Sequence, residues 1–447
     1  MIWAAIHILW SAVGTIWLVV RSGNPASVWG WIAFMLISPP VATLLRILTA
    51  DGAEPTAAAG AVPYRTRLQN CILANCGARL AMRNRVEALH NADRTFAAIM
   101  RDLQRARREI DIEYYIISDD RIGRAIAGIL MRRARAGVRV RIIYDALGSW
   151  RLGRRMLRDM HREGIETAPY GRLRFPYLTP SVHRRNHRKI VIIDGRTAYL
   201  GGINIACRYV DGGKMGFWRD EHIRIEGDAV AQAQGIFAAD WMRTARRTTA
   251  CAADFVPCER HGVTDTLPVQ IAWAQHGPSR MTLTQAFVEA IASARRNIRI
   301  STPYFLPPQT LFDAIRSAAK SGVRVELLVP MRTDVPVAGR ATDSYVRECV
   351  EAGITVYRYR NGFLHSKTLV IDDCIAAVGS ANMDYRSLEY NLEAVAFIYD
   401  RAVTADYISK FHADISVSEP VTARWIAARP FLTRFAEGLA RLVAPVL

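Results

Sequence analysis

The chain has 447 residues, which is enough for two or three domains with substantial cores. Its formal net charge of +18 implies acidic partners, such as nucleic acid or an anionic membrane surface. The seven cysteines are odd in number and none forms a Cys-x2-Cys pair. This pattern argues against a disulfide framework and against a zinc site, and it suits a reducing compartment.

Two apolar runs open the chain. Residues 2–20 contain three polar side chains, and at about 1.5 Å per residue they match the hydrocarbon thickness of a bilayer. Residues 28–45 form a weaker candidate because Pro39 and Pro40 interrupt them, and a buried core helix is the alternative there. No basic segment precedes the first run, which argues against a cleaved signal peptide. We therefore expect two transmembrane helices within residues 1–50.

Basic residues flank these runs unequally. Arg21 is the one basic residue in the short connecting loop, whereas several follow the second run: Arg46, Arg65, Arg67, Arg79, Arg83 and Arg85. The positive-inside rule therefore predicts that the extreme N-terminus and the long C-terminal part both lie in the cytoplasm.

Strands and helices are then expected to alternate. Residues 51–85 are expected to form a linker, since 51–63 are rich in Ala, Gly and Pro. A helix is expected around residues 89–108. The next elements that the pattern predicts are a strand at 110–117, a helix at 121–135, and strands at 138–145, 190–193 and 222–227. We expect them to form an α/β half over residues 86–255.

The same order recurs in a second half, expected over residues 265–415. Its predicted elements are a strand at 297–306, a helix at 309–320, and strands at 323–330, 354–359, 368–371 and 394–399. The segment AGVRV (136–140) aligns with SGVRV (321–325), 185 positions later. Each half is therefore predicted to be an α/β sheet covered by helices on both faces.

Residues 416–447 are predicted to form an amphipathic tail. Apolar residues recur there at helical spacing, namely Phe431, Leu432, Phe435, Leu439 and Leu442, with Arg434 and Arg441 off that face. A helix lying in a membrane interface and a helix packed on the body fit equally well.

One motif occurs in both halves. Residues 187–204 read HRKIVIIDGRTAYLGGIN, and residues 365–382 read HSKTLVIDDCIAAVGSAN. The matched pairs, each 178 positions apart, are His187 and His365, Lys189 and Lys367, Asp194 and Asp372, Gly201 and Gly379, Gly202 and Ser380, and Asn204 and Asn382. A repeat at this distance indicates two domain-sized halves. Only five of the 59 basic residues are lysines, so the matched lysines indicate a need for a compact point charge.

These residue types suit phosphoryl transfer without a metal. Two His and two Lys with Asn and Ser make a cationic, donor-rich set that lacks the usual ligands of Mg2+ or zinc. One imidazole attacks phosphorus and forms a phosphohistidine, while the other protonates the leaving oxygen and then deprotonates the incoming alcohol. Each imidazole needs a partner that fixes its tautomer. Asp220 and Glu393 are candidates, since they are similarly placed in the two halves.

The duplicated motif resembles the phospholipase D superfamily. Together with RNHRKIVIIDG, WRD, TPYFLP, GFLHSK and GSANMDYRS, it makes nearly the whole chain similar to the membrane-anchored bacterial cardiolipin synthases. The resemblance implies two phospholipase D-like α/β sandwich domains and transfer of a phosphatidyl group between two phosphatidylglycerol molecules, without metal or other cofactor. It also implies a bacterial inner membrane location, with phosphatidylglycerol and other anionic lipids as partners, and no nucleic acid. The number of associated chains stays open.

Roles follow from the resemblance by position. His187 would be the nucleophile and His365 the general acid and base. The residues implied to hold the phosphate are Lys189, Lys367, Asn204, Asn382, Gly202 and Ser380. Asp220 would orient His365 and Glu393 would orient His187, each from the opposite half, while Asp194 and Asp372 would support their loops. Two segments depart from the family's commoner sequence, ACRYV (206–210) and MRTDVPV (331–337), and these departures concern the acceptor pocket.

Two further points stay open in the sequence. The segment TPYFLPP (302–308) is expected to line the site, with a plain structural turn as the alternative. A hydrolase, either a phospholipase or a nuclease, would use the same covalent step with water as acceptor. The apolar runs and the tail disfavour a nuclease, and two intact motifs disfavour a non-catalytic binding protein.

Overall fold

The computed structural model describes residues 66–172, 184–245, 265–274 and 282–444, together with positions 255 and 263. All of these described residues belong to one compact unit of the chain. The predicted transmembrane pair lies outside the described residues. Within the described part, no helix combines the length and apolar character needed to cross a bilayer.

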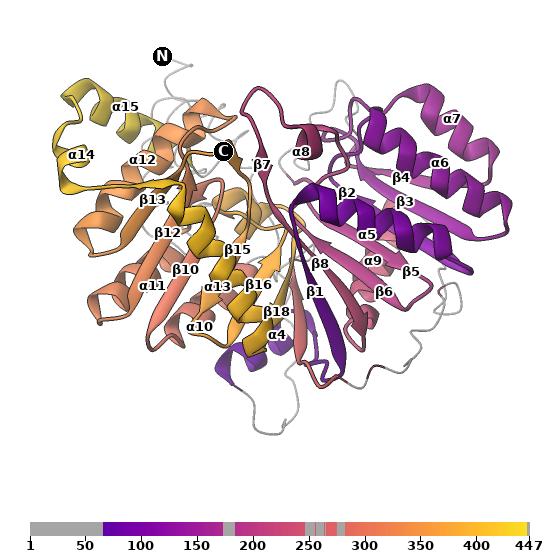
Figure 1. Cartoon of the computed structure of the whole chain (residues 1–447), viewed down its shortest axis with the longest axis horizontal. Coiled ribbons are helices and arrows are strands. Elements are labelled where there is room, and N and C mark those ends of the chain that lie inside the picture. The colour runs from indigo at the N-terminus through magenta and orange to yellow at the C-terminus, as the bar shows by residue number, and fades with distance from the viewer. Residues whose placement is uncertain are drawn as a thin grey trace, which may run out of the picture. The chain divides into compact units, whose positions relative to one another are not determined.

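The first half is built on a seven-stranded mixed sheet (Figure 1) with the order β1-β8-β6-β5-β2-β3-β4. Its strands are β1 (Asn84–His90), β2 (Glu109–Tyr114), β3 (Arg139–Asp145), β4 (Glu166–Tyr170), β5 (Lys189–Ile193), β6 (Thr197–Gly201) and β8 (Glu221–Gly227). Its helices are α5 (Asn91–Arg105), α6 (Arg121–Arg135), α7 (Arg154–Arg162), the short α8 (Arg208–Asp211) and α9 (Val230–Thr244). Strands β2, β3 and β4 are parallel, and the other pairs are antiparallel.

The second half repeats this topology in an eight-stranded sheet with the order β19-β13-β12-β10-β15-β16-β18-β9. Its strands are β9 (Val269–Trp273), β10 (Asn297–Ser301), β12 (Arg324–Pro330), β13 (Thr355–Tyr359), β15 (Thr368–Ile371), β16 (Ile375–Gly379), β18 (Ala394–Ile398) and β19 (Ser418–Pro420). Its helices are α10 (Thr282–Ala292), α11 (Gln309–Lys320), α12 (Pro336–Glu351) and α13 (Arg401–Ser416). From β13 to β9 the order and directions match β4 to β1, so the predicted duplicated α/β fold is confirmed.

The two sheets share a hydrophobic core. Ile190 and Ile192 of β5 belong to the same buried cluster as Val370 of β15. Their neighbours Val191 and Ile193 belong to the cluster beneath the helices of the first half. Successive strand residues point to opposite faces of a sheet, so a strand buried on both sides reads as a continuous apolar run. This explains the uninterrupted IVII of the motif.

Local signals fix the ends of two predicted helices. The carboxylate of Asp120 accepts hydrogen bonds from the amides of Ile122 and Gly123 and caps α6. Gly137, just past α6, and Gly322, just past α11, have φ angles of 86° and 91°. Glycine adopts this left-handed conformation at low cost, which ends a helix. Helices α6 and α11 match the predicted bounds.

The predicted linker over residues 51–85 is wrong for the part that is described. Helix α4 (Arg67–Cys76) begins at a capping box made by Thr66 and Gln69. Its Leu68 and Ile72 are buried in the core of the second half. The first half also begins earlier than residue 86, because β1 starts at Asn84 and pairs along its whole length with β8.

The predicted strand over residues 297–306 is interrupted. Strand β10 ends at Ser301, and β11 (Phe305–Leu306) pairs separately with β17 (Met383–Asp384). Pro303 lies between β10 and β11, and it lacks the amide hydrogen that a sheet ladder needs. Tyr304 lies in this turn and lines the cavity that is described below.

The tail is packed on the body. It contains α14 (Ala423–Ala427) and α15 (Phe431–Leu442). Ala440 and Ala444 are buried in the core of the second half. Arg441 forms an ion pair with Glu348 of α12, and its guanidinium lies 4.0 Å from the ring centre of Tyr345. The packed helix is therefore confirmed, but α15 also has an outer face, which is described below.

The two motif aspartates hold the loops after β5 and β15. Asp194 and Asp372 have φ angles of 53° and 49°, a conformation that Asp tolerates better than most residues. The carboxylate of Asp194 accepts hydrogen bonds from the backbone amides of Arg107, Arg108 and Glu109. Asp372 does the same for residues 295–297. These contacts pin each motif strand to the start of its neighbour.

Asp194→Ala should therefore destabilise the protein without removing a catalytic group. Three charge-assisted hydrogen bonds are lost, so we expect the free energy of unfolding to fall by about 2–4 kcal/mol. Chemical denaturation measures this value. Asp373→Ala is the matched control, because Asp373 makes an exposed pair with Arg296; its cost should stay below about 0.5 kcal/mol. Equal costs for the two variants would contradict the structural role of Asp194.

Candidate active site

The two motifs are brought together where a segment of each half pairs with a segment of the other half. Short strands join the halves, namely β7 (Trp218–Arg219) and β14 (Phe363–Leu364), which pair in parallel. The amide of His365 then donates to the carbonyl of Arg219 at 2.7 Å. In the mirrored arrangement the amide of His187 donates to the carbonyl of Leu392 at 2.9 Å. Each motif histidine therefore lies beside the residue that precedes the other half's carboxylate.

The imidazoles contact carboxylates of the opposite halves. Nδ1 of His187 lies 2.8 Å from Oε1 of Glu393, and Nδ1 of His365 lies 2.6 Å from Oδ2 of Asp220. These are the cross-half pairs that the resemblance implies. The hydroxyl of Ser380 donates to the second carboxylate oxygen of Glu393. A carboxylate accepts the hydrogen of Nδ1, which leaves Nε2 of each ring available for chemistry.

Burial keeps both imidazoles neutral. It lowers the pKa of His187, and it lowers the pKa of His365 to about 4 with the help of the nearby Lys367. Burial would raise the pKa values of both carboxyl groups, but Lys367 and His365 hold the pKa of Asp220 below its usual value, and His187 does so for Glu393. Near neutral pH the site therefore holds two neutral imidazoles, each against a carboxylate.

The two motif lysines lie behind the imidazoles. Nζ of Lys189 donates to the carbonyl of His187, and Nζ of Lys367 donates to that of His365 and lies 3.7 Å from Asp220. Both side chains are buried, and burial lowers the pKa of Lys189 to about 7 and that of Lys367 to about 8. A bound anion would raise both pKa values, because an opposite charge favours the ammonium form.

Anion binding should therefore weaken as the pH rises. The ammonium forms of Lys189 and Lys367 are lost in the free protein between about pH 7 and pH 8. We expect the affinity for a non-transferable phosphonate analogue of a phosphodiester to fall by roughly 10- to 100-fold from pH 7 to pH 9. Titration calorimetry at each pH measures this. Lys367→Met should bind more weakly and show a shallower pH dependence; an affinity independent of pH would contradict the assignment.

A cavity of about 420 Å3 opens beside both imidazoles. His187, His365, Asn204 and Asn382 line it. Nδ2 of Asn204 donates to the hydroxyl of Tyr209, and Nδ2 of Asn382 donates to Asp384. The remaining predicted residues, which do not line the cavity, form the layer behind it: Lys189, Lys367, Gly202, Ser380, Asp220 and Glu393. Asp194 and Asp372 lie farther away, in the supporting loops.

Several residues of the cavity wall were not predicted. Three aromatic rings surround His365, with centroid distances of 5.6 Å to Tyr209, 5.2 Å to Trp218 and 5.7 Å to Phe363. Tyr115 packs against His187 with a centroid distance of 4.7 Å. The wall also contains cations and acids that the motif analysis did not single out: Arg185, Arg208, Arg386, Asp334 and Asp384.

The segments that were expected near the site do reach it. Tyr304 and Leu306 of TPYFLPP line the cavity, which confirms that prediction. The hydroxyl of Tyr304 donates to the carboxylate of Asp334. Asp334 belongs to the departing segment 331–337, and Arg208 belongs to the departing segment 206–210. The departures from the commoner sequence therefore fall on the cavity wall, where Tyr209 of the segment 206–210 also packs against the ring of His365.

Gly202 is matched by Ser380 in the second half, and it lies beside the carboxylate of Asp220. A Cβ atom there would lie 2.3 Å from Oδ1 of Asp220, so any side chain displaces that carboxylate. Gly202→Ala should lower the turnover rate by roughly 100-fold, because small misplacements of orienting groups are costly. Gly235→Ala on α9 is the control, since nothing lies within 4 Å of its new Cβ. Turnover should be compared at equal folded fraction; equal rates in the two variants would contradict the prediction.

The chain is similar to known proteins over most of its length. A family model described as "Cardiolipin synthase, PLD-like domain" matches residues 99–241 and 287–415. The chain is 36% identical over 380 residues to the cardiolipin synthase of Geobacillus kaustophilus, covering 82% of this chain and 73% of that protein. It is 38% identical over 388 residues to the cardiolipin synthase of Staphylococcus aureus, covering 86% and 78%.

Two solved structures have a similar fold. The phosphatidylserine synthase of Haemophilus influenzae has a TM-score of 0.64 at 16% identity, covering 86% of this chain and all of that one. The polyphosphate kinase of Porphyromonas gingivalis has a TM-score of 0.52 at 13% identity, covering 80% of this chain and 53% of that one. At these identities the similarity concerns the fold alone.

Proposed function

The chain belongs to the cardiolipin synthase family with phospholipase D-like domains, and from this premise we propose that its cavity transfers a phosphatidyl group between two phosphatidylglycerol molecules through a phosphohistidine. It is a phospholipid phosphatidyltransferase, and its products are cardiolipin and glycerol. The observation that carries the mechanism is the pair of neutral imidazoles lining one cavity, each held at Nδ1 by a carboxylate from the opposite half.

The first step forms the covalent intermediate. Nε2 of His187 attacks phosphorus, the bond from phosphorus to the glycerol oxygen breaks, and His365 gives its proton to that oxygen. The bound phosphodiester anion favours the imidazolium form of His365 that this proton transfer needs, since an opposite charge raises the pKa. Lys189 and Lys367 balance the negative charge that develops on the nonbridging oxygens. Glycerol then leaves.

The second step reverses the roles. Neutral His365 removes the proton from the hydroxyl of a second phosphatidylglycerol, whose oxygen attacks phosphorus and displaces Nε2 of His187. That acceptor carries its own phosphate. Arg208 and Arg386 on the cavity wall supply positive charge for it, and about 420 Å3 exceeds what a single phosphate group needs.

Product analysis tests the proposed reaction. The full chain should convert labelled phosphatidylglycerol into cardiolipin and glycerol in equal amounts, without added metal. Formation of phosphatidic acid instead would identify water as the acceptor and the protein as a hydrolase. Offering labelled phosphatidylethanolamine in the same mixture reports the donor range through the released headgroup.

The two apolar runs within residues 1–50 support a further part of the proposal. They anchor the enzyme in the bacterial inner membrane with both halves on the cytoplasmic side, where phosphatidylglycerol is within reach. Protease treatment of right-side-out and inverted vesicles tests this topology. Cleavage of the catalytic halves in right-side-out vesicles would overturn it.

A further inference from the structure

Exposed apolar side chains gather in one part of the protein. Of the fourteen large apolar residues that are exposed in the described part of the chain, six belong to α15 and its C-cap: Phe431, Leu432, Phe435, Leu439, Leu442 and Val443. Phe431, Leu432 and Leu442 are each at least 75% exposed. A continuous apolar face of this kind is unusual on a soluble surface and marks a site of interaction.

Contacts between the inner face of α15 and the body of the protein set the orientation of this helix. Glu437 and Ala440 are buried against the body. Arg429 forms ion pairs with both Glu437 and Asp343 of α12, and Arg441 pairs with Glu348. These contacts fix the rotation of the helix about its axis, so the apolar residues face away from the protein core.

Five more exposed apolar residues lie beside the cavity. Val335 lines it and Val337 follows at the first turn of α12. Phe217 precedes Trp218, which is part of the cavity wall. Leu147 and Trp150 belong to the same turn as Ser149, whose hydroxyl donates to the carbonyl of Tyr115, another residue of that wall. Eleven of the fourteen exposed apolar residues are therefore on α15 or at the cavity rim.

Helix α12 connects these two groups. Its first turn lines the cavity, and Arg441 of α15 contacts it at Tyr345 and Glu348. At about 1.5 Å per residue, nine to twelve residues separate these positions by roughly 14–18 Å. Figure 1 shows α15, α12 and β7 along the upper edge of the picture, with α14 and α15 at its outer left end and α12 between them and β7. Helix α12 therefore links the helix that carries the apolar face to the cavity wall.

Positive charge accompanies the apolar residues. Exposed arginines of the same segments include Arg151, Arg154, Arg155, Arg332, Arg340, Arg424 and Arg434, and they outnumber the exposed acid Asp334 beside Val335. Glu437, the one acid of α15, is buried and paired with Arg429, so it does not cancel this charge. Apolar residues combined with arginines are typical of a surface that binds anionic lipid. A second copy of the chain would bring like charges together in a symmetric interface, which is unfavourable.

We propose that α15 and the cavity rim form a lipid-docking face, made of the outer residues of α15 with Trp150, Phe217, Val335 and Val337, that seats the cavity mouth on an anionic bilayer. The face lets a phospholipid headgroup enter the cavity while its acyl chains stay in the membrane. The proposal rests on the proposed function in that the substrate is a membrane lipid. It assigns the tail a role beyond packing on α12.

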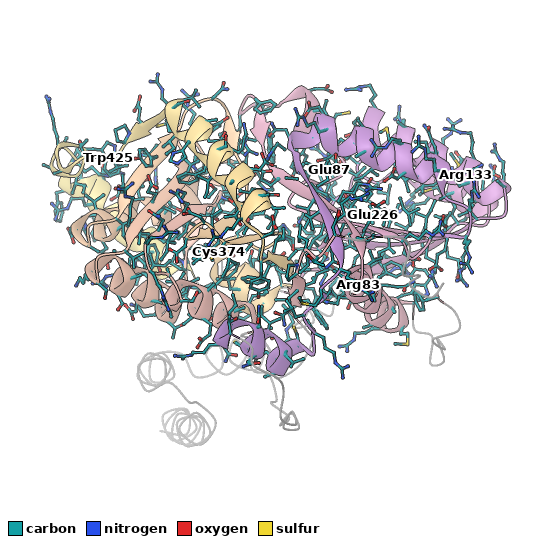
Figure 2. All side chains as sticks on the ribbon, turned by 60° about the horizontal axis from the view of Figure 1, so that its bottom comes forward. Arg83, Glu87, Arg133, Glu226, Cys374 and Trp425 are labelled. Carbon is teal, nitrogen blue, oxygen red and sulfur yellow. The ribbon has the colours of Figure 1, made fainter. Side chains whose placement is uncertain are left out.

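Photo-crosslinking identifies what covers the face. Benzoylphenylalanine is placed at Leu439 in the full chain, which is reconstituted into vesicles of phosphatidylglycerol and phosphatidylcholine carrying an alkyne-tagged lipid. Met82, 50% exposed and next to Arg83, is the control position; Figure 2 shows Arg83 well apart from Trp425 of α14. We expect at least ten times more lipid adduct at position 439 than at position 82. Adducts with a second copy or with residues 1–65, or equal lipid labelling at both positions, would overturn the proposal.

Enzyme kinetics provide a second test of the lipid-docking face. The double variant Leu432→Glu/Leu439→Glu should lower the rate on phosphatidylglycerol vesicles at least fivefold and leave the rate on monomeric dihexanoyl-phosphatidylglycerol within twofold. Met82→Glu/Met242→Glu, at exposed apolar positions outside the face, should change neither rate. An unchanged vesicle rate, or equal losses on both substrates, would contradict the lipid-docking face. If the unmodified chain makes no cardiolipin from either substrate, the proposed function fails, while the lipid adducts still report on the face.

Discussion

Replacing either motif histidine with Gln is expected to lower cardiolipin formation by roughly 1000-fold or more. His187→Gln removes the nucleophile, and His365→Gln removes the group that moves the proton. Residues that act as a unit are not additive, so the double variant should be no slower than either single variant. The rate of cardiolipin release by the purified full chain measures this. His161→Gln, on an exposed ring that contacts Thr167, is the control and should retain full activity.

An activated substrate separates the two roles. A short-chain phosphodiester with a p-nitrophenol leaving group needs no proton at the departing oxygen. His365→Gln should therefore still release a burst of about one equivalent of p-nitrophenol as the intermediate forms, whereas His187→Gln should give none. A burst from His187→Gln and none from His365→Gln would reverse the assignment of nucleophile and acid.

The orienting carboxylates provide the second large effect. Asp220→Asn and Glu393→Gln should each slow turnover by roughly 100-fold, because an amide presents N–H groups to Nδ1 and favours the wrong tautomer. Each variant should also behave like the substitution of the histidine that its carboxylate contacts. Asp220→Asn should keep the p-nitrophenol burst, as His365→Gln does, and Glu393→Gln should lose it, as His187→Gln does.

This pattern tests partnership between the halves rather than mere stability. If each carboxylate instead served the histidine of its own half, the two variants would exchange their burst behaviour. Asp406→Asn is the control, because its carboxylate contacts the ring of His90 at the exposed edge of α13, away from the cavity. Its turnover should stay within about twofold of the unmodified protein.

The sequence was most informative where a local pattern and the tertiary fold agree. The repeat itself predicted two matching halves. The pattern also predicted a helix at residues 121–135, the bounds of α6, where Asp120 and Gly137 supply the capping chemistry. The run IVII predicted a strand at residues 190–193, and the structure buries that strand on both faces, because Ile190 and Val191 face different cores.

Other elements depend on contacts that no local pattern reveals. Strand β1 alternates weakly, and its pairing with β8 joins residues more than a hundred positions apart. Helix α4 is short, and Leu68 and Ile72 gain stability from the core of the second half rather than from propensity. Its capping box, Thr66 with Gln69, was a readable signal that the Ala- and Gly-rich stretch before it obscured.

The motif residues of the site could be predicted from the sequence, but the residues of the cavity wall could not. Arg185, Arg208 and Arg386 are three of many arginines in the chain, so composition gave no reason to select them. Arg185 is oriented by Asp145, forty positions earlier, and by Gly171. The aromatic enclosure of His365 likewise needs Trp218 and Phe363 to meet through the pairing of β7 with β14. Such contacts follow from the fold, not from spacing.

Trapping the covalent intermediate tests the central claim most directly. The full chain is mixed with phosphatidylglycerol labelled with 32P, quenched within milliseconds in base, and digested for peptide mapping. We predict a phosphatidyl label that is stable in base, labile in acid and located on His187, and that accumulates in His365→Gln when an activated donor is used. A label on any other residue, or none despite continuing cardiolipin formation, would contradict the account.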